Sequence, residues 1–287
     1  YQNRSIYPVG KSVNWLTGTD KYVFSENGNL MVQDVNAKNA KTLLTLDQVN
    51  SYLNAAGMDS ITRLPNLTWL DADKAYYYSY NKNTNNVDLN LLNTKTKEIR
   101  KVTEVPVNAE NHTITTPSLK VAYTIDNNLY YAEGEKQVQV TDNAENVIAG
   151  QSVHRNEFAI NGGIFWSPDG NKLAYYSMDE SMVADYPLVD ITTRVAEAKP
   201  IKYPMAGMTS HEVTLKVYNT ENGEETDVKT EGPADQYLTS ITWNPDNEKI
   251  YIGVLNREQN HLQFNEYNAL NGEFLQTIFE DKDEQYV

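Results

Sequence analysis

Cysteine is missing from this chain of 287 residues, and so is any apolar run long enough to cross a bilayer. The lack of cysteine excludes disulfides, zinc–thiolate sites and thiol nucleophiles, and it leaves both a cytoplasmic and a periplasmic location open. A transmembrane helix needs about 18 apolar residues in a row, so we expect no membrane span in this chain. The start, Tyr1-Gln2-Asn3, has neither the initiator Met nor the features of a signal peptide. We therefore expect a cut piece of a longer protein.

Basic residues are also scarce. There are 24 Lys and Arg against 39 Asp and Glu, which gives a formal net charge of −15. Binding to nucleic acid needs a basic surface, so we do not expect nucleic acid as a partner. The histidines never occur in pairs at metal-ligand spacing, and we expect neither a metal site nor a cofactor. They are His112, His154, His211 and His261.

Tyrosine is abundant, with 20 residues against 6 Phe, and this bias favours pleated sheets on which an aromatic ring packs while its hydroxyl stays wet. Short apolar, Tyr-rich runs alternate with turns of Asn, Asp and Gly, which is typical of successive antiparallel strands. The pattern repeats as a four-stranded unit about five times. Such a unit must stack on its neighbours to bury both faces, so the repeats predict an all-β fold, a β-propeller of four-stranded antiparallel blades. The predicted blades are residues 10–46, 66–103, 112–141, 163–225 and 238–280.

Two insertions interrupt the blades. Residues 47–58 have helical spacing, with Gly57 placed to end the helix. Residues 178–210 are rich in Pro and Met and too long for an ordinary hairpin loop. Because about five blades are present, we expect an incomplete, open part of a larger propeller, with exposed sheet edges.

A charged cluster precedes the strand of the fourth blade. His154, Arg155 and Glu157 lead into Phe165 and Trp166, and fixed charges on a buried strand could be presented to a small ligand. The alternative is a solvated surface turn with marginal ion pairing, which is the usual fate of such clusters.

Three sequence motifs in the second half of the chain carry a resemblance. They are Trp166-Ser167-Pro168-Asp169-Gly170, Tyr203-Pro204-Met205-Ala206-Gly207 and Leu255-Asn256-Arg257-Glu258-Gln259-Asn260. The ordered set resembles the N-terminal β-propeller of dipeptidyl peptidase IV, of the bacterial type, in the prolyl oligopeptidase family. In the first half, only the blade pattern is similar.

The resemblance implies a serine-type exopeptidase that removes X-Pro or X-Ala dipeptides from peptides with free N-termini, in the periplasm or outside the cell. In that family the catalytic Ser, Asp and His lie in a C-terminal α/β-hydrolase domain, while the propeller gates access and holds the substrate's ammonium group. No G-x-S-x-G motif occurs here, so we expect no catalytic residue in this chain, with the last blades and the hydrolase domain lying beyond it. The implied partners are peptide substrates, the protein's own hydrolase domain, and a second copy contacted through residues 178–210.

The same resemblance implies the site residues. The family carries paired Glu residues just before the Trp-Ser-Pro strand, where this chain reads His154-Arg155-Asn156-Glu157-Phe158. Glu157 alone matches, so it is the predicted anchor for the substrate's N-terminus, with Glu180 or Asp179 as a candidate second carboxylate. Further candidates for substrate or supporting contacts are His154, Arg155 and Asn156.

Arg155 has two predicted roles. It could pair with Glu157, or it could bind a substrate carbonyl in place of the family's second-blade Arg, which the hairpin at 81–86 lacks. A different class stays open for the whole chain: a non-enzymatic periplasmic propeller that binds a protein or peptide as a scaffold. A hydrolase domain encoded after Val287 would favour the peptidase, and a stop codon or an unrelated domain would favour the scaffold.

Overall fold

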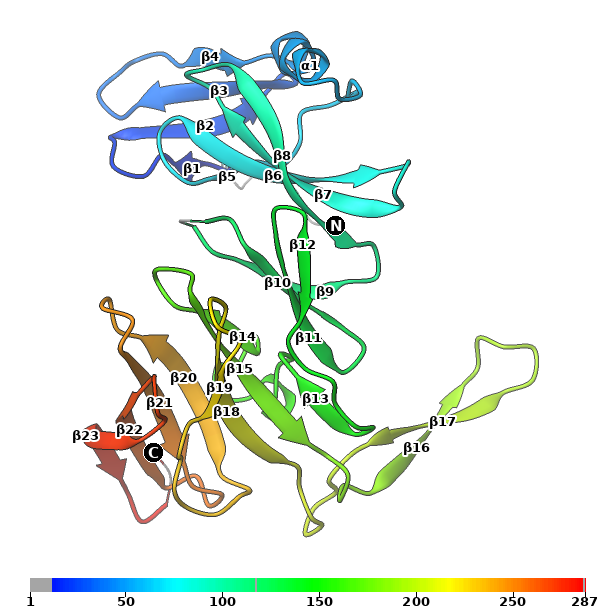
Figure 1. The fold of residues 1–287 in the computed structure, drawn as a ribbon, viewed down its shortest axis with the longest axis vertical. Helices are drawn as coiled ribbons and strands as arrows, with labels where there is room; N and C mark the ends of the chain where they lie inside the picture. The colour runs from blue at the N-terminus through cyan, green and yellow to red at the C-terminus, as the bar shows by residue number, and fades with distance from the viewer. Residues whose placement is uncertain (1–11, 117, 286) are drawn as a thin grey trace, which may run out of the picture. The chain divides into compact units, whose positions relative to one another are not determined.

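The structure is a computed structural model that describes residues 12–116, 118–285 and 287. The chain divides into two compact units, an N-terminal unit (Tyr1–Val107) and a C-terminal unit (Asn108–Val287). Antiparallel sheets dominate the described residues of both units, so the predicted all-β fold of four-stranded antiparallel sheets is confirmed (Figure 1).

The N-terminal unit contains two four-stranded meanders in which each strand pairs with the next along the chain. The first contains β1 (Asn14–Trp15), β2 (Lys21–Glu26), β3 (Asn29–Asp34) and β4 (Lys41–Leu44). The second contains β5 (Thr68–Trp69), β6 (Lys74–Asn81), β7 (Asn86–Asn93) and β8 (Glu98–Pro106). The turn between β2 and β3 contains Asn27 and Gly28, both with positive φ, which matches the preference of the tight hairpin turn for this pair.

A helix, α1 (Leu46–Ala55), lies between these two sheets in the sequence. It starts with a capping box, in which the Thr45 side chain accepts from the Gln48 backbone N–H and the Gln48 side chain accepts from the Thr45 backbone N–H. Val49 and Leu53 are its buried residues, and they join the core formed by the two sheets. The helix occupies most of the predicted insertion at 47–58.

The C-terminal unit contains three further sheets. The first is β9 (Glu110–Ile114), β10 (Val121–Ile125), β11 (Asn128–Glu133) and β12 (Lys136–Gln139). The middle sheet is β13 (Val147–Ala149), β14 (Ile164–Trp166), β15 (Lys172–Asp179), β18 (Glu212–Asn219) and β19 (Glu225–Asp227). The last is β20 (Tyr237–Trp243), β21 (Lys249–Leu255), β22 (His261–Asn268) and β23 (Phe274–Lys282). In the middle sheet, β13 and β14 both pair with β15, at its end and at its start respectively.

The Trp residues of the repeats link neighbouring sheets of this unit. The indole N–H of Trp166 donates to the Thr113 carbonyl at 3.3 Å, and that of Trp243 donates to the Phe165 carbonyl at 3.0 Å. In both cases the acceptor belongs to the preceding sheet. The largest core of the unit lies between the middle and last sheets and includes Leu215 and Leu238.

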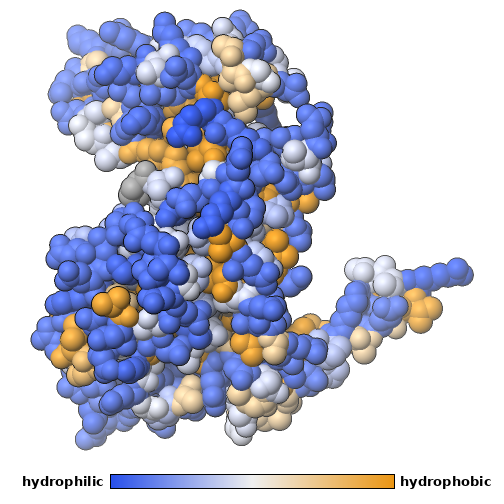
Figure 2. All heavy atoms as spheres, in the orientation of Figure 1, coloured by the Kyte–Doolittle hydropathy of each residue, from blue (hydrophilic) through white to orange (hydrophobic). Residues whose placement is uncertain are grey.

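The second insertion forms a hairpin, β16 (Asp185–Asp190) and β17 (Glu197–Lys202), which we call the arm. It extends away from the sheets of its unit (Figure 1), and apolar side chains are exposed along it (Figure 2). They are Tyr186, Leu188, Val189, Ile191, Val195 and Ile201.

Candidate functional site

The predicted charged cluster lies in a loop, residues 150–163, that leaves the middle sheet after β13 and returns to it at β14. Its two ends meet at one residue: the Gly150 N–H donates to the Tyr176 carbonyl at 2.9 Å, and the Tyr176 N–H donates to the Gly163 carbonyl at 3.0 Å. A Cβ atom on Gly163 would lie 2.0 Å from the Gln151 carbonyl oxygen, so only glycine fits there. The base of the loop is therefore tightly closed.

Two apolar residues anchor the loop. Val153 and Ile160 are buried in the core between the middle and last sheets. The Ser152 hydroxyl crosses the base of the loop and donates to the Ile160 carbonyl at 3.2 Å. The residues between these anchors are thereby held as a compact tip.

The tip has an unusual backbone. A single turn, η2 (His154–Asn156), has three consecutive residues with φ of 51°, 56° and 60°, and Phe158 and Ala159 follow with φ of 52° and 61°. Left-handed conformation costs about 1–2 kcal/mol for an L-residue other than glycine. Strain of this kind persists only where the surroundings enforce it, and it clusters at functional sites. The tip is therefore a candidate site on backbone geometry alone.

Side chains from other elements brace this strained turn. The Arg155 Nη2 atom donates to the Lys202 carbonyl at 2.7 Å, and the guanidinium lies 4.4 Å from the centre of the Tyr203 ring. From β20, the Thr239 hydroxyl donates to the Phe158 carbonyl at 2.7 Å. The Tyr237 ring contacts the rings of both His154 and Phe158, with centroid distances of 4.9 and 4.6 Å.

His154 is the buried member of the turn. It is 4% exposed, and its Nδ1 atom lies 3.0 Å from Nε2 of His211, which is 9% exposed. Burial and, to a smaller extent, the nearby charges of His211 and Arg257 together lower the pKa of His154 to about 3. The imidazole is therefore neutral at pH 7. Burial also lowers the pKa of His211.

Glu157 follows the turn and is exposed. Its backbone N–H donates to the His154 carbonyl at 3.1 Å, and its own carbonyl accepts from the Ile160 N–H at 3.0 Å. Within residues 12–116 and 118–285, its carboxylate has no hydrogen bond or ion pair. This carboxylate is thus held by the backbone and left free to bind a cation.

A cavity of about 330 Å³ lies beside the turn. Its walls include four of the six predicted site residues, namely His154, Arg155, Asn156 and Glu180. Glu157 and Asp179 are not part of the lining. A second cavity, of about 760 Å³, shares Arg155, Glu180 and Lys202 with the first. Burial raises the pKa of Glu180, and the nearby Lys202 and Arg155 oppose that rise.

Sequence reasoning missed most of the residues that brace the turn. Lys202, His211, Tyr237 and Thr239 lie far from η2 in the sequence and have no motif in common with it. Arg257, in the predicted motif after β21, donates to the Tyr237 hydroxyl and lies over its ring. Arg257 therefore holds Tyr237 in place, and Tyr237 in turn contacts His154 and Phe158.

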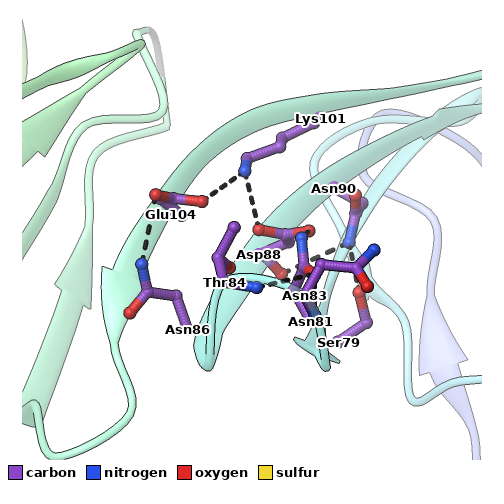
Figure 3. Close-up of polar contacts among 9 residues, drawn as sticks. All are labelled: Ser79, Asn81, Asn83, Thr84, Asn86, Asp88, Asn90, Lys101 and Glu104. Carbon is purple, nitrogen blue, oxygen red and sulfur yellow. Dashed lines mark hydrogen bonds and ion pairs between the residues drawn. The ribbon is translucent and has the colours of Figure 1, made fainter. Parts of the chain in front are cut away.

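A second polar cluster occupies the N-terminal unit (Figure 3). The carboxylate of Asp88 lies 2.8 Å from Lys101 Nζ and accepts from the Asn81 amide at 2.9 Å, while Lys101 also pairs with Glu104. The hairpin at 81–86 thus supplies an amide to an ion pair in which the carboxylate is buried and the ammonium group is exposed. A cavity of about 660 Å³ borders this cluster. Because Asp88 and Lys101 satisfy one another, we assign the cluster a stabilising role.

The described residues contain no group of three His, Asp or Glu that could hold a metal ion. In the same part of the chain, every helix is too short or too polar to span a bilayer.

Comparison with known proteins places the chain in a family. The profile of the family described as "Dipeptidyl peptidase IV (DPP IV) N-terminal region" matches residues 66–287, more than half of the chain. This chain belongs to that family. The resemblance inferred from the three sequence motifs is thereby confirmed.

Relatives of this N-terminal region include a fungal protein from Phaeosphaeria nodorum named "Probable dipeptidyl-aminopeptidase B", 27% identical over 90% of this chain. Dipeptidyl peptidase 4 of Felis catus is 24% identical over 94% of the chain. The chain spans about a third of the length of these relatives, 32% and 37% respectively.

Solved structures agree in fold. A protein from Bacteroides ovatus assigned as a dipeptidyl aminopeptidase IV is 36% identical and superposes with a TM-score of 0.84, covering 97% of this chain and 39% of its own. Dipeptidyl peptidase 4 of Porphyromonas gingivalis shares the fold, with a TM-score of 0.71 at 18% identity over 96% of this chain and 40% of its own.

Proposed function

We propose that this chain is the substrate-selecting propeller region of a serine exopeptidase that releases X-Pro or X-Ala dipeptides from free N-termini. Glu157 binds the terminal ammonium group of the substrate, and a C-terminal α/β-hydrolase domain supplies the Ser, Asp and His that cut the peptide bond. The observation that carries the proposal is the exposed carboxylate of Glu157, which follows a strained and braced turn and has no partner among the described residues. Membership of the dipeptidyl peptidase IV family supports the reaction class.

The chemistry of the turn suits this role. An ammonium group is a compact cation, and a carboxylate that faces it forms a strong charge-assisted hydrogen bond. A carboxylate on a fixed backbone also sets the distance between the substrate's first residue and the bond to be cut. The closed base of the loop at Gly150 and Gly163 and the anchors Val153 and Ile160 restrict that distance.

The Glu157→Gln substitution tests the proposal. In the complete protein we expect it to lower kcat/KM for Gly-Pro-p-nitroanilide about 10- to 100-fold, because a hydrogen bond to a charged group contributes about 1.5–3 kcal/mol. Steady-state kinetics measure the effect. Glu135→Gln changes an exposed carboxylate elsewhere in the C-terminal unit and should leave kcat/KM unchanged.

N-acetyl-Gly-Pro-p-nitroanilide lacks the terminal charge and should be a poor substrate for both wild type and Glu157→Gln. Wild-type efficiency of Glu157→Gln on the free amine would rule out Glu157 as the anchor. The absence of a hydrolase domain from the complete protein would instead favour a non-enzymatic peptide-binding scaffold.

The arm is the proposed contact surface for a second copy of the protein. Val189 is 64% exposed and Leu188 is 44% exposed on β16. Apolar side chains gathered on a projecting hairpin mark an interaction site. We expect wild type to sediment as a dimer and the Leu188→Asp, Val189→Asp variant as a monomer in analytical ultracentrifugation. A double variant that remains dimeric would place the contact elsewhere.

A further inference from the structure

Arg155 joins the strained turn to the base of the arm. Its guanidinium donates to the carbonyl of Lys202, the last residue of β17, and lies over the ring of Tyr203. The Tyr203 N–H donates to the Ala184 carbonyl at 3.0 Å and so closes the hairpin just before β16 begins. Arg155 therefore contacts the two residues at which the arm returns to its unit.

The neighbouring residue of the turn holds the other end of the same segment. His154 contacts His211, which directly precedes β18. Residues 203–211 connect the arm to β18, and η2 is attached at both ends of this connection. Two adjacent side chains, a buried imidazole and an exposed guanidinium, therefore attach the tip to this connection.

These contacts bear on the two roles that the sequence left open for Arg155. Among the residues that the structure describes, Arg155 forms no ion pair with Glu157. Its planar guanidinium is already occupied by a carbonyl and by an aromatic face, two contacts that suit Arg and that Lys reproduces only in part. The Lys202 carbonyl takes up one of the five N–H groups of the guanidinium, so Arg155 is already bonded within its own chain.

We propose that Arg155 is a positioning residue for amine recognition: by fastening η2 to Lys202 and Tyr203 at the base of the arm, it keeps the Glu157 carboxylate where a substrate's ammonium group binds. This inference rests on the proposed role of Glu157. The base of the arm then contributes to substrate recognition, because Lys202 and Tyr203 hold Arg155. The Arg acts through the turn and does not touch the substrate.

A double-mutant cycle in the complete protein tests the proposal. We expect Arg155→Ala to raise KM for Gly-Pro-p-nitroanilide about tenfold with little change in kcat, because it weakens binding and leaves the chemical step alone. In the Glu157→Gln background the same substitution should change KM less than twofold, since two residues that act through one interaction are not additive. Arg155→Lys should recover part of the loss.

Arg63→Ala removes an exposed arginine from the N-terminal unit and should match wild type. If the increase in KM of the double variant equals the product of the two single increases, Arg155 acts independently of Glu157. That result would overturn the proposal in favour of direct substrate contact. A wild-type KM for Arg155→Ala would overturn it as well.

Hydrogen exchange separates this inference from the proposed function. The Glu157 N–H and the Ile160 N–H are bonded within the loop, and both should exchange at least tenfold faster in Arg155→Ala than in wild type. Peptides spanning 153–160 report this by mass spectrometry. If Glu157→Gln keeps wild-type kcat/KM, the proposed function fails. Faster exchange in Arg155→Ala would still show that Arg155 holds the turn in place. Unchanged exchange would overturn it.

Discussion

Replacing Lys101 with Met is expected to destabilise the N-terminal unit by about 1–3 kcal/mol, the usual loss when a buried acceptor is left without its partner. The side chain of Asp88 is 8% exposed, whereas that of Lys101 is 39% exposed. The substitution therefore leaves a buried carboxylate beside Glu104 with no cation between them. The bonds from Lys101 hold the pKa of Glu104 below its ordinary value.

Urea-dependent hydrogen exchange of β7 and β8 measures this loss, with the C-terminal unit of the same chain as an internal reference. Lys95→Met, in the exposed turn between β7 and β8, should change stability by less than about 0.5 kcal/mol. Adding Asp88→Leu to Lys101→Met should regain most of the loss, because an apolar pair can replace a buried ion pair. A Lys101→Met variant as stable as wild type would mean that water solvates Asp88 well enough without Lys101.

Local chemistry explains why the sheets could be predicted. Gly170, Gly223 and Gly272 each have φ between 73° and 77°. Glycine adopts such positive φ values without steric cost, so its presence in the sequence marks these turns. The capping box of Thr45 and Gln48 marks the helix start in the same way. By contrast, β13 pairs with the far end of β15 and contains only three residues, too few to show a strand pattern.

The candidate site was less visible in the sequence. Glu157 was predicted from a motif, but the left-handed turn before it contains no glycine and therefore carries no local signal. Its shape depends on contacts that span 47 residues to Lys202 and 81 residues to Thr239. Contacts at such separation are set by the packing of the middle and last sheets, which composition and spacing do not specify.

Acid is expected to destabilise the C-terminal unit through His154. Burial and the charges of His211 and Arg257 lower the folded-state pKa of His154 to about 3, against 6.5 for an unperturbed histidine. Below pH 6.5 His154 binds a proton in the unfolded chain but stays neutral in the folded chain. The stability contributed by neutral His154 is therefore full above pH 6.5 and falls as the pH drops toward 3. At pH 4.5 the loss amounts to about 2–3 kcal/mol.

His154→Asn isolates this contribution, because asparagine tolerates the left-handed conformation at that position and does not titrate. Stability of the C-terminal unit, measured by urea unfolding at pH 7 and at pH 4.5, should fall by about 2–3 kcal/mol less in the variant than in wild type. The comparison cancels other groups that protonate in this range, including His112 and the carboxylates. An equal acid loss in both proteins would show that His154 takes up its proton without disturbing the turn. The buried pair with His211 would then not hold η2 in place.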